Sequence, residues 1–116
     1  MAPRDLIKKA IVAQKRAEAP YSSYPVGAAL LTTDDFVILG CNIESKAYPT
    51  TLCAERVAIF SAISQGYKDF SAMALITPDG AFPCGSCRQI IHEYAGNIPI
   101  YIAKDLDNYD TQKISD

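Results

Sequence analysis

The second half of the sequence alternates short apolar runs with longer segments whose apolar residues recur at helical spacing. From residue 36 onward the pattern predicts strand, helix, strand, helix and strand, over residues 36–43, 53–64, 71–77, 84–94 and 98–103. This alternation favours parallel pairing of the later strands through right-handed crossovers. We therefore predict a mixed sheet with helices packed against it.

The first half adds a helix and a hairpin to this arrangement. Residues 3–17 carry an amphipathic pattern that ends near Pro20, and a loop rich in Pro and Ser follows over 19–25. Two apolar runs, 26–32 and 36–43, are separated by a short polar turn, which predicts two antiparallel strands. The polar tail adds at most a short edge strand over 109–114.

Size, composition and charge limit the classes of function. The 116 residues suit one domain, and 49% of them are hydrophobic, which is enough to bury a core. No apolar run approaches the roughly 20 residues that cross a bilayer, and the N-terminus has no secretion signal, so we expect a cytoplasmic protein without a membrane partner. A net charge of −2 gives no general basic surface for nucleic acid.

Three of the four cysteines lie where predicted helices begin. Cys53 opens one helix, and Cys84 and Cys87 open the next. Thiolates are favoured at helix N-termini, and parallel strands bring both helix starts to one edge of the sheet. Three sulfur ligands leave a fourth tetrahedral position open, as in catalytic zinc sites. The alternatives are a structural zinc site or three unrelated core thiols.

Two charged residues, Glu55 and Arg56, lie shortly after Cys53. Glu55 lies two positions further on, so it can share a pocket with Cys53 only if both occupy the first turn of the helix. A carboxylate that does not bind the metal can act there as a proton carrier. Arg56 can hydrogen-bond the sulfur ligands and withdraw their negative charge.

These two segments, 53–56 (CAER) and 83–89 (PCGSCRQ), resemble the motifs of the small, homotetrameric zinc-dependent cytidine deaminases of nucleoside salvage. The resemblance runs from about Tyr21 to Tyr101 and includes Asn42-Ile-Glu44. It implies a three-layer α/β/α fold with a five-stranded mixed sheet. It also implies a single domain over 1–116 in which the family's C-terminal helix is absent or shortened.

The resemblance also implies roles for individual residues. Cys53, Cys84 and Cys87 would hold one Zn²⁺ per subunit. Glu55 would carry protons to N3 of the pyrimidine and to the leaving ammonia.

Five further residues match positions that contact the nucleoside in this family. Asn42 and Glu44 would bind the ribose hydroxyl. Tyr24, where the family usually has phenylalanine, would stack near the base. The backbone N–H of Ala54 would meet the pyrimidine O2, and Tyr48 would reach the site of a neighbouring subunit. The alternatives are hydrogen bonding at a strand end for Asn42 and Glu44, and loop packing for Tyr24.

The expected activity is therefore hydrolytic deamination of cytidine and deoxycytidine by a homotetramer with shared active sites and no nucleic-acid partner. Two departures leave alternatives open. Lys46 follows the Asn-x-Glu motif where the family has a small residue, so either it is a solvated lysine or it accommodates a 5′-substituent. The chain also ends early, which leaves two alternatives: deamination of a modified or larger aminopyrimidine nucleoside, such as a nucleoside antibiotic, or nucleoside binding with little turnover.

Overall fold

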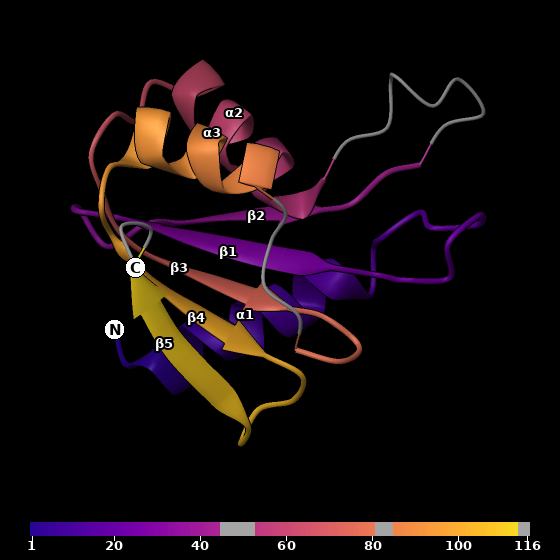
Figure 1. The fold of residues 1–116 in the computed structure, drawn as a ribbon. Coiled ribbons are helices and arrows are strands. Elements are labelled where there is room, and N and C mark those ends of the chain that lie inside the picture. The colour runs from indigo at the N-terminus through magenta and orange to yellow at the C-terminus, as the bar shows by residue number, and fades with distance from the viewer. Residues whose placement is uncertain (45–52, 81–84, 114–116) are drawn as a thin grey trace.

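The computed structural model describes residues 1–44, 53–80 and 85–113, with the side chains of 85–87 outside the description. Its elements follow the expected order (Figure 1): α1 (Pro3–Gln14), β1 (Gly27–Thr32), β2 (Val37–Cys41), α2 (Ala54–Ser64), β3 (Phe70–Ile76), α3 (Gly85–Ala95), β4 (Pro99–Ala103) and β5 (Tyr109–Lys113). In the described part of the chain no helix is both long and apolar enough to cross a membrane.

The five strands form one mixed sheet in the order β2-β1-β3-β4-β5. β1 is antiparallel to both β2 and β3, β3 is parallel to β4, and β5 is antiparallel to β4. α2 and α3 cover one face and α1 covers the other, which gives three layers (Figure 1). The predicted α/β/α fold with a five-stranded mixed sheet is confirmed.

Two hydrophobic clusters fill the spaces between these layers. The cluster beneath α2 and α3 includes Ala58, Ile59 and Met73, all fully buried. The cluster beneath α1 includes Leu6, Ile7 and Ala10, which recur at helical spacing on one face of that helix. Alternate residues of β1, β2 and β4 pack into opposite clusters, as the pleat of a strand requires.

The helix ends follow from local sequence. α1 begins with Pro3 in its first turn and has Asp5 near the positive end of the helix dipole. It ends at Gln14 rather than at the expected Ala17, because Glu18 donates its N–H to the Asn42 carbonyl at 3.0 Å and pairs with the chain beyond β2.

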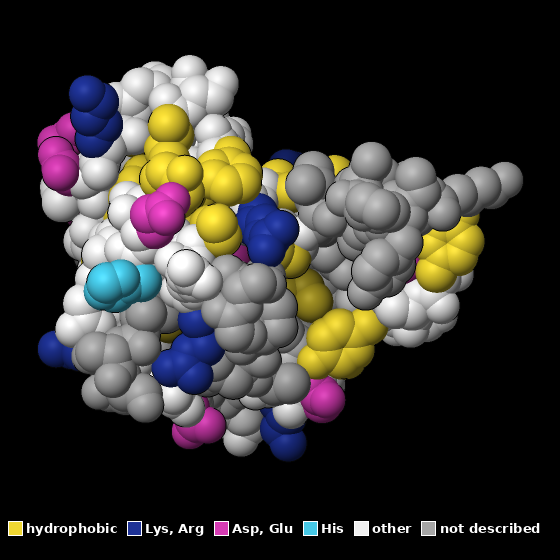
Figure 2. Space-filling view, turned by 45° about the horizontal axis from the view of Figure 1, so that its top comes forward, with side chains coloured by type: hydrophobic (Ala, Val, Ile, Leu, Met, Phe, Trp, Pro, Cys, Tyr) yellow, Lys and Arg dark blue, Asp and Glu magenta, His cyan; other side chains and the backbone are white. Residues whose placement is uncertain are grey.

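α2 carries part of its hydrophobic surface on the outside. Phe60 and Tyr94 form an edge-to-face ring pair at 5.6 Å that joins α2 to α3, and both side chains are exposed. Figure 2 shows hydrophobic side chains gathered on this surface of the α2–α3 layer.

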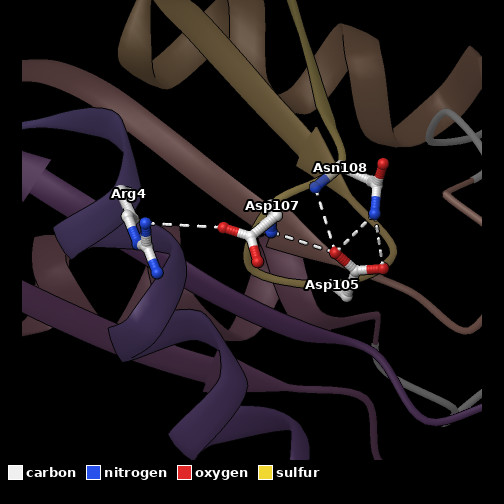
Figure 3. A network of polar contacts seen from close by, with 4 residues as sticks. All are labelled: Arg4, Asp105, Asp107 and Asn108. Carbon is white, nitrogen blue, oxygen red and sulfur yellow. Dashed lines mark hydrogen bonds and ion pairs between the residues drawn. The ribbon is translucent and has the colours of Figure 1, made fainter.

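A polar turn positions the edge strand β5. The Asp105 carboxylate accepts hydrogen bonds from the N–H groups of Asp107 and Asn108 and from the Asn108 side chain (Figure 3). These bonds hold the pKa of Asp105 below its ordinary value, with the Asn108 side chain contributing most. Arg4 of α1 forms an ion pair with Asp107 at 3.4 Å, but both side chains are exposed, so the pair contributes little stability.

Candidate metal and substrate site

One end of each of the strands β1, β2, β3 and β4 lies along the same edge of the sheet. Gly27, the first residue of β1, pairs with Cys41 at the end of β2 and with Ile76 at the end of β3. Ile76 in turn pairs with Ala103 at the end of β4. α2 and α3 both begin above this edge (Figure 1). It is the edge outside the carboxyl ends of parallel strands, where ligand sites of α/β proteins form.

Cys53 lies at the N-terminal cap of α2 and is half-buried. Its backbone is extended (φ −85°, ψ 156°), and its carbonyl accepts the N–H of Val57 at 3.1 Å. Cys53 therefore lies at the end of the helix rather than along its side. There the helix dipole favours a thiolate over a thiol, which is the form that binds metal ions.

Glu55 is buried in the first turn of α2, with only 4% of its surface exposed. A buried carboxylate is costly unless hydrogen bonds or opposite charge stabilise it, so such residues are concentrated at functional sites. Cys53 lies at the cap of α2 and Glu55 in its first turn. Both are therefore at the start of the helix, which is the condition for the two side chains to share a pocket. Arg56, the next residue, is half-buried.

Gly40 allows the first turn of α2 to pack directly on β2. A Cβ atom at Gly40 would lie 2.4 Å from the Ala54 carbonyl oxygen and 2.5 Å from the Ala58 nitrogen. Ala54 itself is fully buried. The close approach places the start of α2 beside the end of β2, which leads into Asn42.

Asn42 connects this strand end to the loop before β1. Its side-chain oxygen accepts the Val26 N–H, and its side-chain nitrogen donates to the Tyr24 carbonyl, both at 2.9 Å. These bonds match the alternative given above for Asn42, which is hydrogen bonding at a strand end. The ribose contact of Asn42 stays a prediction.

Glu44 holds the other end of the same loop. Its carboxylate accepts the N–H groups of Tyr21 and Ser22, each at 3.0 Å, and the Ser22 hydroxyl. The hydrogen bonds from Ser22, the hydroxyl first, keep the pKa of Glu44 below its ordinary value. Glu44 is therefore ionised at neutral pH.

Tyr24 is half-buried, and its hydroxyl donates to the carboxylate of Asp79 in the turn after β3. Burial and then the Asp79 carboxylate raise the pKa of the Tyr24 phenol. The hydroxyl therefore stays protonated and remains a donor. Neither this contact nor that of Ser22 with Glu44 could be predicted from the sequence, because each joins segments far apart in the chain.

The remaining predicted site residues are not described. Lys46, Tyr48 and Cys84 lie outside the described residues, as does the side chain of Cys87. The described side chains alone include no group of three metal-binding residues. The positions that are described suit a thiolate-bound metal: Cys53 at one helix start, and the backbone of α3 beginning at Gly85, between the other two cysteines in sequence.

Several known proteins are similar to this chain in sequence. Residues 2–102 match the family described as the zinc-binding region of cytidine and deoxycytidylate deaminases. The chain is 47% identical over 100 residues to the cytidine deaminase of Sporosarcina psychrophila, covering 84% of this chain and 74% of that protein. It is also 47% identical over 103 residues to the cytidine deaminase of Halalkalibacterium halodurans, covering 80% and 78%.

The fold is also similar to that of a solved structure. The crystal structure of cytidine deaminase from Burkholderia pseudomallei superposes with a TM-score of 0.93 at 36% identity. The superposition covers 99% of this chain and 94% of that one.

Proposed function

The chain belongs to the cytidine and deoxycytidylate deaminase family, and from this premise we propose that it hydrolyses cytidine and deoxycytidine to uridine and deoxyuridine with release of ammonia. It is a zinc-dependent enzyme. The observation that carries the proposal is the burial of Glu55 in the first turn of α2, beside Cys53 at the cap of that helix. A modified or larger aminopyrimidine nucleoside as substrate is not favoured, because the relatives at 47% identity are cytidine deaminases.

We propose that Cys53, Cys84 and Cys87 hold the zinc ion. Bound by these three thiolates, zinc would supply a water that is nucleophilic near neutral pH. Arg56, adjacent to Glu55 at the start of α2, would offset part of the negative charge of three sulfurs.

Glu55 would move the protons. The reaction forms a bond between the water oxygen and C4 of the pyrimidine and breaks the bond between C4 and the amino nitrogen. Glu55 would accept a proton from the attacking water and deliver it to N3. It would then take the proton that remains on the added oxygen and pass it to the amino nitrogen, which leaves as ammonia while the C4 carbonyl forms. Burial of its carboxylate keeps competing solvent protons away from this transfer.

The substrate contacts are proposed from the positions of five residues. Asn42 and Glu44 follow the end of β2, both hydrogen-bond to the loop before β1, and would hold the ribose hydroxyl. Tyr24, in the loop that both of them anchor, would stack near the base. The N–H of Ala54 has no partner within α2, as in the first turn of any helix, and would bind O2 of the pyrimidine. Tyr48 would contact a neighbouring subunit.

Turnover of cytidine tests the proposal. The wild-type protein should lower the ultraviolet absorbance of a cytidine solution and release one ammonia per uridine formed. Glu55→Gln should reduce kcat by about 10²–10⁴-fold, the range for loss of a general acid–base group, without loss of zinc. Glu93→Gln, the same change at an exposed carboxylate on α3, is the matched control and should be fully active. A wild-type protein without turnover, or full activity in Glu55→Gln, would contradict the proposal.

We propose further that the enzyme is a cytoplasmic homotetramer with shared active sites, which the predicted role of Tyr48 requires. Light scattering on the intact protein should give four times the mass of one chain, and a monomer would contradict shared sites.

A further inference from the structure

A hydroxyl–carboxylate hydrogen bond joins two loops at the edge of the sheet where α2 and α3 begin. Tyr24 belongs to the loop before β1, and Asp79 belongs to the turn that follows β3. The two residues are 55 positions apart in sequence. The Asp79 side chain is exposed and the Tyr24 ring is half-buried, so the carboxylate holds the ring from its outer, solvent side.

The backbone of Tyr24 is fixed from the opposite direction. Asn42 donates to the Tyr24 carbonyl, and the Ser22 hydroxyl accepts the Tyr24 N–H at 3.1 Å. Two residues later, Val26 packs against the hydrophobic cluster that contains Ala54, the first residue of α2. The main chain of this loop is thus fixed close to the start of α2, and the remaining freedom of Tyr24 is the direction of its ring.

We propose that Asp79 is a positioning residue for the substrate base: it holds the Tyr24 ring, through the phenolic hydroxyl, in the orientation that receives the pyrimidine. This inference rests on the proposed function. Asp79 does not touch the reacting atoms. It acts on binding, because a ring that is held in place loses less conformational freedom when the base arrives.

A double-mutant cycle at Tyr24 and Asp79 tests the inference, with the steady-state kinetics of cytidine deamination measured for each variant. Tyr24→Phe and Asp79→Ala should each raise KM about two- to tenfold, the range for loss of one hydrogen bond, with kcat within about twofold of wild type. The double variant should be no worse than Tyr24→Phe, because loss of the hydroxyl already removes its bond to Asp79. Asp79→Asn, whose amide oxygen can still accept, should recover most of the wild-type KM.

A matched control removes the hydroxyl from another tyrosine–carboxylate pair. Tyr94 bonds to Glu93 near the C-terminal end of α3, far along the helix from its start at the sheet edge. Tyr94→Phe should leave both KM and kcat unchanged. Thermal unfolding of every variant separates an effect on binding from a loss of folded protein.

The outcomes distinguish this inference from the proposed function. Unchanged KM in Asp79→Ala, or KM increases that multiply in the double variant, would overturn the role of Asp79 in an otherwise active enzyme. A wild-type protein that fails to deaminate cytidine would overturn the proposed function instead. In that case uridine titrated against the same variants tests the inference, and equal dissociation constants across the series would overturn it.

Discussion

At the scale of single residues, side chains of the proposed site hold one another in place through hydrogen bonds. Glu44 shows this most clearly, because its carboxylate accepts three hydrogen bonds from Tyr21 and Ser22. Hydrogen bonds to the charged form favour that form, so the pKa of Glu44 is lowered and the carboxylate stays ionised. The stabilising effect is complete above the ordinary pKa of glutamate and is lost as the pH falls through the lowered value.

Ser22→Ala removes the largest cause of this shift. The pKa of Glu44 should rise toward its ordinary value, so the loop anchored by Glu44 should loosen at a higher pH than in the wild-type protein. An NMR titration that follows the carboxyl carbon of Glu44 measures this directly. Ser61→Ala is the control, since Ser61 bonds to Gln65 on α2 and should leave the Glu44 titration unchanged. An unshifted Glu44 in Ser22→Ala would refute this explanation of the low pKa.

At the scale of elements, the geometry of the site depends on how closely α2 approaches the sheet. Gly40 of β2 meets the backbone of α2 at Ala54 and Ala58, so no side chain separates the two elements there. Gly27 of β1 plays the same part for α1 on the opposite face, where a Cβ atom would lie 2.1 Å from the Ala10 carbonyl oxygen. Cys53 and Glu55 therefore take their positions from a contact at Gly40.

Gly40→Ala should displace the start of α2. The added methyl group overlaps helix backbone, so we expect a loss of about 1–3 kcal/mol in unfolding free energy, or more if the helix cannot shift. Chemical denaturation measures that loss, and kcat per folded molecule should fall as well. Gly27→Ala should cost comparable stability with a smaller effect on kcat, because α1 carries none of the proposed site residues. Equal effects of the two variants on kcat would argue against this account.

At the scale of the whole molecule, most of the fold was predictable from the sequence. The alternation of apolar strands and helices fixes the order of elements, and the two helix starts that carry Cys53 and Cys87 fix the edge that forms the site. β5 gave only a weak signal, because its residues are mostly exposed and polar, and turn hydrogen bonds around Asp105 position it. The contact between Tyr24 and Asp79 was not predictable, since no local pattern in the sequence indicates which side chains of two distant loops meet.

Some features of the candidate site could likewise be predicted from the sequence, and others could not. The burial of Glu55 follows from its place in a helix that packs on the sheet, and the strand-end position of Asn42 follows from the end of β2. The convergence of the three sulfur atoms is still a prediction, because Cys84 and the side chain of Cys87 lie outside the described residues.

X-ray absorption at the zinc edge of the zinc-loaded protein tests that convergence most directly. We predict one zinc ion per chain with three sulfur neighbours at about 2.3 Å and one lighter atom, oxygen or nitrogen, in the open position. Four sulfur neighbours, which would require Cys41 as well, or a shell without sulfur would contradict a catalytic zinc site at the starts of α2 and α3.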